Sequence, residues 1–295
     1  ESRGLGDVYK RQVNGSERIR TGMTTSFGVV GSPIEHSLSP VLHAAAYKHL
    51  GVVVEYDKNL VASGELRSFL DSRALAGVSV TMPLKQEAFA LATSHDKYSL
   101  ATGVANTLFR EGGNWSAANT DVYGITQALA ATPDPHLTVL IGSGSTARSA
   151  LVALSQKFPA TEIGILARNR EAAAELCGFA SSLGFSASVH PPSRQLLLSA
   201  NLVMSLVPAG SFTELWKEVA LDTAPRTGTL FDVAYNPWPS EAGLAWDSGR
   251  VVSGIEMLIW QAIEQVQLFV TSTGLEAQID RDVLYQVMKA SVSSK

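Results

Sequence analysis

The segment 142–147 has the residue types and spacing of a phosphate-binding loop, G-x-G-x-x-A. It directly follows an apolar stretch, residues 137–141, and it opens a predicted helix, which is the context that a dinucleotide site requires. Free backbone N–H groups at the start of such a helix bind phosphate. We therefore predict a cofactor-binding loop, although a plain strand–helix turn is the alternative. Its candidate binding residues are Gly142, Ser143, Gly144, Ser145, Thr146 and Ala147.

An arginine follows the next predicted strand, residues 161–166, where a dinucleotide site distinguishes between its cofactors. NAD sites usually place Asp or Glu near this point to hold the ribose 2′-hydroxyl. Here the first carboxylate after the strand is Glu171. Arg168 and Arg170 stand there instead, and a guanidinium can grip a 2′-phosphate. We predict NADP as the cofactor with Arg168 as a binding residue. The alternative is a pair of solvated charges, which the helix dipole would disfavour at this end.

Polar segments also end several predicted strands or begin helices, and α/β proteins place ligand-binding groups at strand ends. These segments occupy residues 31–40, 77–85, 103–107 and 119–124.

The elements that must position these segments alternate between strand and helix. We predict strands at 27–30, 52–56, 77–81, 105–109, 115–118, 137–141, 161–166, 186–189, 202–205, 229–232 and 251–253. We predict helices at 41–50, 64–70, 83–92, 120–130, 148–157, 170–183, 255–271 and 280–290. The pattern indicates an α/β protein of two domains.

The domain boundaries follow from this pattern. Residues 1–22 lack periodicity and are expected to be a disordered or non-native extension, so that order begins near Met23. We expect a substrate-binding catalytic domain over 23–121, a Rossmann-type NADP-binding domain over 122–255, and C-terminal helices over 256–295 that return to the first domain.

Composition excludes several classes of protein. With 45% hydrophobic and 17% charged residues, the chain is neither disordered nor a coiled coil. The formal net charge of −4 disfavours a nucleic-acid binder, and no apolar run is long enough for a transmembrane helix. A single cysteine, Cys177, fits a reducing cytoplasm and is expected to be a small core residue. The spacing of His36, His43 and His49 gives no ligand face, so no metal is expected.

Taken together, the polar segments resemble those of the shikimate dehydrogenase family. The resemblance runs from about Phe27 to the C-terminus and includes residues 232–237 and 254–262. The sequence of residues 79–83, Ser-Val-Thr-Met-Pro, resembles that of the actinobacterial branch of the family. This implies a cytoplasmic oxidoreductase that reduces 3-dehydroshikimate to shikimate with NADPH, in the biosynthesis of chorismate and the aromatic amino acids. Composition already disfavours a nucleic-acid or membrane partner, and a homodimer stays open.

The resemblance also assigns roles to individual residues. Ser37 and Ser39 match the pair that holds the substrate carboxylate, although Ser39 could equally cap the helix that follows. The remaining matches to substrate-binding positions are Thr81, Asn106, Tyr235 and Gln261, and Val233 and Gly254 match the cofactor side.

Lys85 and Asp121 match the catalytic pair of the family. Hydride transfer to a ketone builds negative charge on oxygen, so a nearby cation and proton donor are needed. Lys85 could supply both while Asp121 orients it. Without the resemblance, Lys85 would be read as a solvated helix lysine and Asp121 as part of a helix cap.

The chain departs from the family at two places. Many members carry asparagine where this chain has Ser79, and we expect the shorter serine to lose a substrate contact or to make it through water. Residues 167–169, Ala-Arg-Asn, stand where Asn-Arg-Thr is common, but Arg168 is retained. Two alternatives stay open: an NAD-dependent quinate/shikimate dehydrogenase, which Arg168 disfavours, and a non-catalytic dinucleotide-binding sensor, which Lys85 and Asp121 disfavour.

Overall fold

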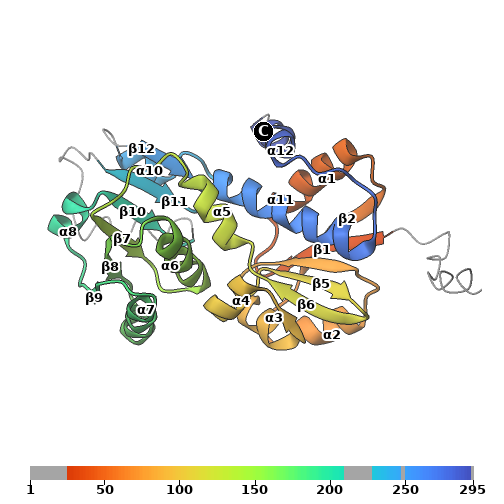
Figure 1. Ribbon diagram of the computed structural model, residues 1–295, viewed down its shortest axis with the longest axis horizontal. Coiled ribbons are helices and arrows are strands. Elements are labelled where there is room, and N and C mark those ends of the chain that lie inside the picture. Colours follow the sequence, from red (N-terminus) through yellow and green to blue (C-terminus); the bar gives the residue numbers. More distant parts are fainter. Residues whose placement is uncertain (1–24, 209–227, 247–249, 294–295) are drawn as a thin grey trace, which may run out of the picture.

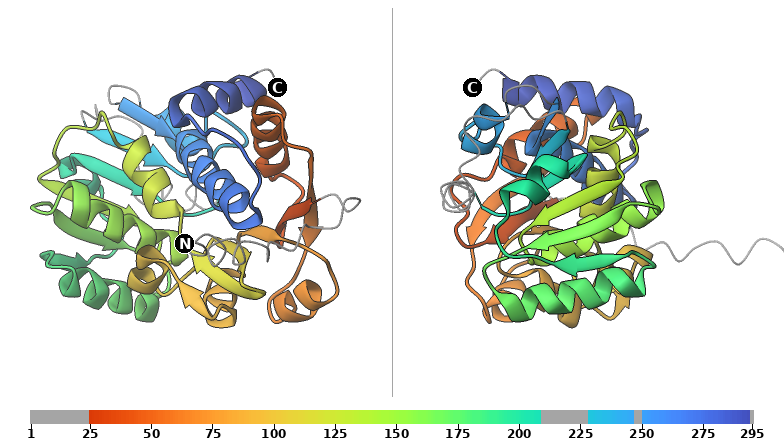
Figure 2. Two further views of the ribbon diagram at one scale, coloured as in Figure 1. Left: turned by 45° about the vertical axis from the view of Figure 1, so that its right-hand side comes forward. Right: turned by 90° about the vertical axis from the view of Figure 1, so that its left-hand side faces the viewer.

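The computed structural model describes residues 25–208, 228–246 and 250–293, which form two α/β units, each built on a six-stranded sheet (Figure 1). The extension expected over 1–22 and the predicted start near Met23 lie outside these residues. A long helix crosses from one unit to the other, so the two units lie side by side (Figure 2).

The first sheet has the strand order β2-β1-β3-β5-β6-β4. The first three strands in this order are mutually parallel, and β5 and β6 form the predicted antiparallel hairpin. The strand predicted at 52–56 instead covers Val54–Leu60. Its Asp, Lys and Asn residues have low strand propensity, so the sequence did not indicate a strand there. They are tolerated because β2 lies at an exposed edge of the sheet. The strands are β1 (Thr25–Gly31), β2 (Val54–Leu60), β3 (Gly77–Val80), β4 (Ser94–His95), β5 (Thr107–Glu111) and β6 (Asn114–Ala118).

Helices cover both faces of the first sheet. One face packs against α1 (Ser39–Leu50), α11 (Gly254–Thr273) and α12 (Arg281–Ser293), so the C-terminal helices do return to the first unit, as predicted. The other face packs against α2 (Leu66–Asp71) and α3 (Lys85–Leu91). Two short elements, β4 and α4 (Lys97–Thr102), were not predicted, because neither is long enough to show a periodicity.

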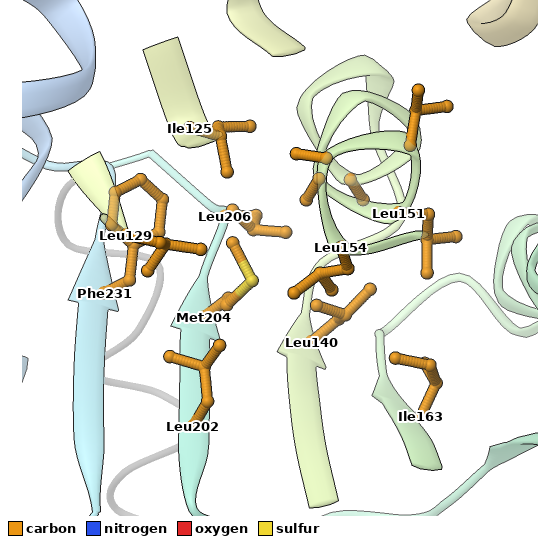
Figure 3. Packing of buried hydrophobic residues seen from close by; sticks show 14 of the residues in the cluster. Ile125, Leu129, Leu140, Leu151, Leu154, Ile163, Leu202, Met204, Leu206 and Phe231 are labelled. Carbon is orange, nitrogen blue, oxygen red and sulfur yellow. The ribbon is translucent and has the colours of Figure 1, made fainter. Parts of the chain in front are cut away.

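The second sheet is parallel throughout, with the order β12-β11-β10-β7-β8-β9. Its core strands are apolar because both faces are covered. Figure 3 shows one of these faces, where Leu140, Met204 and Phe231 of the strands meet Leu151 and Leu154 of a helix. The strands are β7 (Leu137–Ile141), β8 (Glu162–Leu166), β9 (Ala187–Val189), β10 (Leu202–Ser205), β11 (Thr229–Asp232) and β12 (Arg250–Ser253).

The helices of the second unit divide between the two faces. The face in Figure 3 is covered by α5 (Asp121–Ala128), α6 (Ser145–Lys157) and α7 (Arg170–Ser182). The opposite face is covered by α8 (Arg194–Ser199) and α10 (Glu241–Ala245), two short helices that were not predicted. The helix predicted at 148–157 begins earlier, at Ser145, because Gly142 turns the chain with a φ of 113° and the helix follows almost at once.

Helices α5 and α11 cross closely and join the two units. At Gly124 of α5 an added Cβ would lie 2.7 Å from the carbonyl oxygen of Met257, so no side chain fits there. Helix α11 then continues along the first sheet (Figure 1). This crossing brings polar residues of α11 to the place where the first sheet faces the second.

Candidate active site

A cavity of about 280 Å³ lies between the two units. The first unit and helix α11 contribute polar side chains to it, and the second unit contributes three further residues. The predicted site residues on its wall are Ser37, Ser39, Thr81, Lys85, Asn106, Asp121, Thr146, Val233, Tyr235, Gly254 and Gln261. Residues predicted from distant parts of the sequence therefore come together around one space.

Lys85 and Asp121 form an ion pair on the cavity wall. Helix α3 begins at Lys85 and α5 begins at Asp121, so each charge stands at a helix start. Lys85 Nζ lies 2.5 Å from Asp121 Oδ2, and the two side chains are 13% and 5% exposed. The interpretations of Lys85 as a solvated lysine and of Asp121 as a capping side chain are wrong.

Asn106 holds the other oxygen of the Asp121 carboxylate. Its Nδ2 donates to Asp121 Oδ1 at 2.8 Å and to Gln261 Oε1 at 3.1 Å. Its Oδ1 accepts the backbone N–H of Thr120 at 2.8 Å. Because a backbone N–H can only donate, this contact fixes which end of the Asn106 amide faces the carboxylate. Asn106 is thus a buried residue whose side-chain amide is engaged at both ends.

Ser37 and Ser39 both line the cavity, and the alternative in which Ser39 caps the following helix is not what the structure shows. Ser39 lies inside the first turn of α1, whose N-cap position is Leu38 without a side-chain hydrogen bond. Ser39 is therefore no capping residue. Ser37 Oγ instead accepts the backbone N–H of Ser39 at 3.3 Å, so its hydroxyl proton stays available to a ligand.

Residues after strand β11 form the second unit's side of the cavity. Val233 and Tyr235 follow the strand, and Asp232 Oδ1 accepts the N–H of Ala234 at 3.1 Å, which shapes this turn. Burial raises the pKa of the Tyr235 phenol. Gly254 begins α11 directly against Val233, where an added Cβ would overlap the Val233 carbonyl.

The glycine loop has the geometry that phosphate binding needs. Space is open above Gly144, where an added Cβ would meet no atom within 4 Å. No side chain caps α6, so its first N–H groups are not used by a capping residue. Ala147 is completely buried against the core, as predicted from close helix–strand packing. Of the predicted loop residues, all of which the structure describes, only Thr146 reaches the cavity itself.

Arg168 is exposed at the end of β8, away from the cavity. The next residue, Asn169, caps α7 by accepting the N–H of Ala172 at 3.1 Å. Arg168 therefore stands just before a helix start, and the first carboxylate after it in the sequence is Glu171.

Cys177 is only partly buried against the core of the second unit, which corrects the expectation of a core residue.

Sequence reasoning missed a buried polar group behind the cavity. Gln265, which is 1% exposed, lines the cavity together with Ser79. His43 lies behind them, stacked on the ring of Tyr56 with 4.0 Å between the centroids. A signal was present, because Gln265 follows Gln261 by four residues and so shares its face of a largely apolar helix.

Burial controls the protonation of this group. It lowers the pKa of His43 to about 3 and raises the pKa of the Tyr56 phenol far above its ordinary range. Both side chains are therefore neutral near pH 7.

Among the described residues, no cluster of three or more His, Cys, Asp or Glu residues could hold a metal ion. No helix in the described ranges is long and apolar enough to cross a membrane.

The second sheet is parallel and carries a glycine loop, and the Lys–Asp pair lies in a cavity that faces it. This arrangement is typical of nicotinamide-dependent dehydrogenases. A sequence model of the shikimate dehydrogenase substrate-binding domain matches residues 29–108. A shikimate dehydrogenase (NADP(+)) of Nostoc sp. is 30% identical over 282 residues, covering 90% of this chain and 97% of that protein. The chain therefore belongs to the shikimate dehydrogenase family.

Solved structures agree with this assignment. The crystal structure of Mycobacterium tuberculosis shikimate dehydrogenase is 32% identical and covers 92% of this chain and 100% of its own, with a TM-score of 0.76. A Thermus thermophilus shikimate 5-dehydrogenase in complex with shikimate is 25% identical, with the same coverages and a TM-score of 0.76.

Proposed function

We propose that this chain is an NADP-dependent shikimate dehydrogenase, which interconverts 3-dehydroshikimate and shikimate. The observation that carries the proposal is the Lys85–Asp121 ion pair on the wall of a cavity that the nucleotide-binding unit closes. Membership of the family supports the reaction, and its NADP-dependent relatives support the cofactor. Neither the NAD-dependent quinate enzyme nor a non-catalytic sensor is favoured.

The residues present fit NADP. The open space above Gly144 and the uncapped start of α6 suit a pyrophosphate, and Arg168 at the end of β8 suits a 2′-phosphate. Thr146, Val233 and Gly254 reach the cavity and would lie beside the nicotinamide. When bound, NADPH supplies the hydride for the reduction.

The first unit would hold the substrate and handle the proton. Ser37 and Ser39 are assigned to the carboxylate, and Thr81, Asn106, Tyr235 and Gln261 are assigned to the rest of the substrate. As the carbonyl carbon accepts hydride, its oxygen gains negative charge, and the Lys85 ammonium stabilises this charge and donates the proton. Asp121 keeps Lys85 in place, because Asn106 fixes its carboxylate from the other side.

A direct assay tests this proposal. The purified enzyme is given shikimate with NADP, and the absorbance of the reduced nicotinamide is followed; parallel assays use NAD and quinate. We expect reduction of NADP with shikimate and much slower reactions in the other combinations. A preference for quinate with NAD would favour the alternative enzyme, and no reduction at all would favour the sensor.

The cellular setting and assembly are proposed separately. We propose a cytoplasmic location, which a single cysteine supports because disulfide frameworks are typical of oxidising compartments. The homodimer stays a prediction, and sedimentation velocity at several protein concentrations tests it.

A further inference from the structure

A chain of buried hydrogen bonds leads from the catalytic carboxylate to Ser79. Its first member is Asn106, whose Nδ2 donates to Asp121, so that its Oδ1 faces the other way and accepts. Thr107 Oγ1 lies 2.8 Å from that oxygen and must donate its only proton to it. The Thr107 oxygen is therefore left as an acceptor.

Gln265 is the next member of this chain, and its orientation follows from the first. Its Nε2 lies 3.1 Å from Thr107 Oγ1 and 3.1 Å from the Asn106 carbonyl oxygen. Both of these oxygens accept, so the amide nitrogen must face them. Oε1 then faces the cavity side, where Ser79 Oγ lies 2.7 Å away and His43 Nε2 lies 3.3 Å away.

The Ser79 hydroxyl is constrained from two sides. Because Oε1 of Gln265 cannot donate, Ser79 must give it its proton. The Tyr56 hydroxyl lies 2.7 Å from Ser79 Oγ and donates to it, since the single Ser79 proton already goes to Gln265. Ser79 lines the cavity, so what it still offers to a ligand there is one oxygen lone pair.

We propose that Gln265 is a positioning residue that fixes Ser79 as a hydrogen-bond acceptor, so that the site selects a substrate with a donating hydroxyl at this position. The inference rests on the proposed function, because shikimate carries hydroxyls besides the one that is oxidised. A group that only accepts, such as fluorine, would place two lone pairs against each other there. Ser79 would then contact the substrate hydroxyl directly and not through water, the route that its short side chain suggested.

His43 reports the direction of the whole chain. If Oε1 of Gln265 faces it, Nε2 of His43 carries the proton and Nδ1 accepts from the Tyr47 hydroxyl at 3.3 Å. A reversed amide would require the opposite tautomer and would make Ser79 a donor toward the cavity. Burial keeps the ring neutral, so one ring nitrogen donates and the other accepts across neutral pH, and the two hydrogen-bond partners select which is which.

The first experiment reads this tautomer by ¹⁵N NMR of the full-length protein with labelled histidine. The His43→Asn variant identifies the His43 signals, and exposed His49 serves as the comparison histidine. We expect a protonated Nε2 and an unprotonated Nδ1. A proton on Nδ1 would overturn the proposal, and this readout does not depend on the enzyme being active.

The second experiment measures selectivity. Each non-reacting hydroxyl of shikimate is replaced in turn by fluorine, and kcat/KM is compared with that for shikimate. For one analogue, we expect the wild-type enzyme to lose about tenfold or more beyond the other, as a hydrogen bond is exchanged for a repulsive contact. In Gln265→Leu that extra loss shrinks to about twofold, because Ser79 is free to turn its proton into the cavity.

Controls separate positioning from folding. Gln267→Leu makes the same substitution on α11 at a half-buried position away from the cavity, and should keep the wild-type selectivity. If Gln265→Leu fails to fold, Ser79→Ala must lose the same selectivity. A variant that slows all substrates by one common factor would show that Gln265 is merely structural. A wild-type enzyme inactive on shikimate would instead refute the proposed function, while the His43 tautomer would still decide the direction of the chain.

Discussion

At the scale of single residues, Lys85 and Asp121 form one ion pair. Their atoms lie 2.5 Å apart in a site where both side chains are largely buried, and Asn106 occupies the second carboxylate oxygen. Removing either partner leaves the other charge without its counterion. The loss of function should therefore not divide cleanly between them.

We expect Lys85→Ala to lower kcat by about 10²–10⁴, the range typical of a lost proton-transfer group, with a smaller change in KM. Asp121→Asn should also lower kcat, and the double variant should lose less than the product of the two single effects. A double-mutant cycle on folded proteins measures this, with exposed Lys48→Ala as the control. Strict multiplicativity, or full activity of Lys85→Ala, would remove the pair from the mechanism.

Ser37 offers a second test at this scale. Its oxygen accepts the Ser39 N–H, so its hydroxyl proton stays available for the proposed contact with the substrate carboxylate. A hydrogen bond to a charged group contributes about 1.5–3 kcal/mol, so Ser37→Ala should raise KM for shikimate about ten- to a hundredfold and leave KM for NADP unchanged. Exposed Ser72→Ala should change neither constant. A lower melting temperature with a normal KM would make Ser37 a structural residue.

At the scale of elements, the junction between β8 and α7 holds the residue to which we assign the choice of cofactor. Strand β8 ends at Leu166 and α7 begins at Arg170, with Asn169 as its capping residue. The short connection therefore leaves Arg168 exposed at the carboxyl edge of the second sheet. Dinucleotides bind at this edge in open α/β sheets, close to the glycine loop.

We expect the wild-type enzyme to favour NADP, and Arg168→Asp to weaken NADP by about 2–4 kcal/mol while sparing NAD. The reason is that a charge-assisted bond is replaced by repulsion between two negative groups. Titrating each cofactor by fluorescence gives the two dissociation constants. Arg67→Asp makes the same change of charge on α2, far from the loop, and should leave both constants unaltered. Equal kcat/KM for NADP and NAD in the wild-type enzyme would contradict the prediction.

At the scale of the molecule, hydrogen bonds and the α5–α11 crossing hold the two units together. Arg148 of α6 donates through Nε to the Thr102 carbonyl at the end of α4, at 2.6 Å. Buried Asn119 donates to both Thr102 Oγ1 and Ser149 Oγ, each at 2.9 Å. Because Asn119 immediately precedes Thr120 and Asp121, the contact between the units lies directly beside the proposed catalytic pair.

His43 should make the stability of the whole molecule depend on pH. Its pKa is about 3 in the fold, below the ordinary value of 6.5, so the unfolded chain binds a proton that the folded chain does not. This contribution is fully present above pH 6.5 and is lost as pH falls from 6.5 towards 3, with a slope of about 1.4 kcal/mol per pH unit. Urea unfolding at several pH values measures it. His43→Asn should flatten the curve by that amount. Equal slopes for wild type and His43→Asn would contradict the prediction.

Much of this protein was predictable from sequence because the deciding interactions are local. The strands at 137–141, 202–205 and 229–232 appear with the predicted bounds, since a strand covered on both faces must be apolar throughout. The turn at Gly142 followed from a loop pattern that needs an unusual backbone conformation. The roles proposed for Lys85 and Asp121 came from the resemblance to a family, because in the sequence neither residue alone differs from an ordinary surface charge.

What the tertiary structure decided lies between residues far apart in the chain. Gln265 meets Ser79 across a sequence separation of 186, and His43 meets Gln265 across 222. Nothing near Ser79 in the sequence encodes the direction of its hydroxyl proton. That direction depends on donors and acceptors that only the return of α11 to the first sheet brings together, because a hydrogen bond is set by position in space and not by neighbours along the chain.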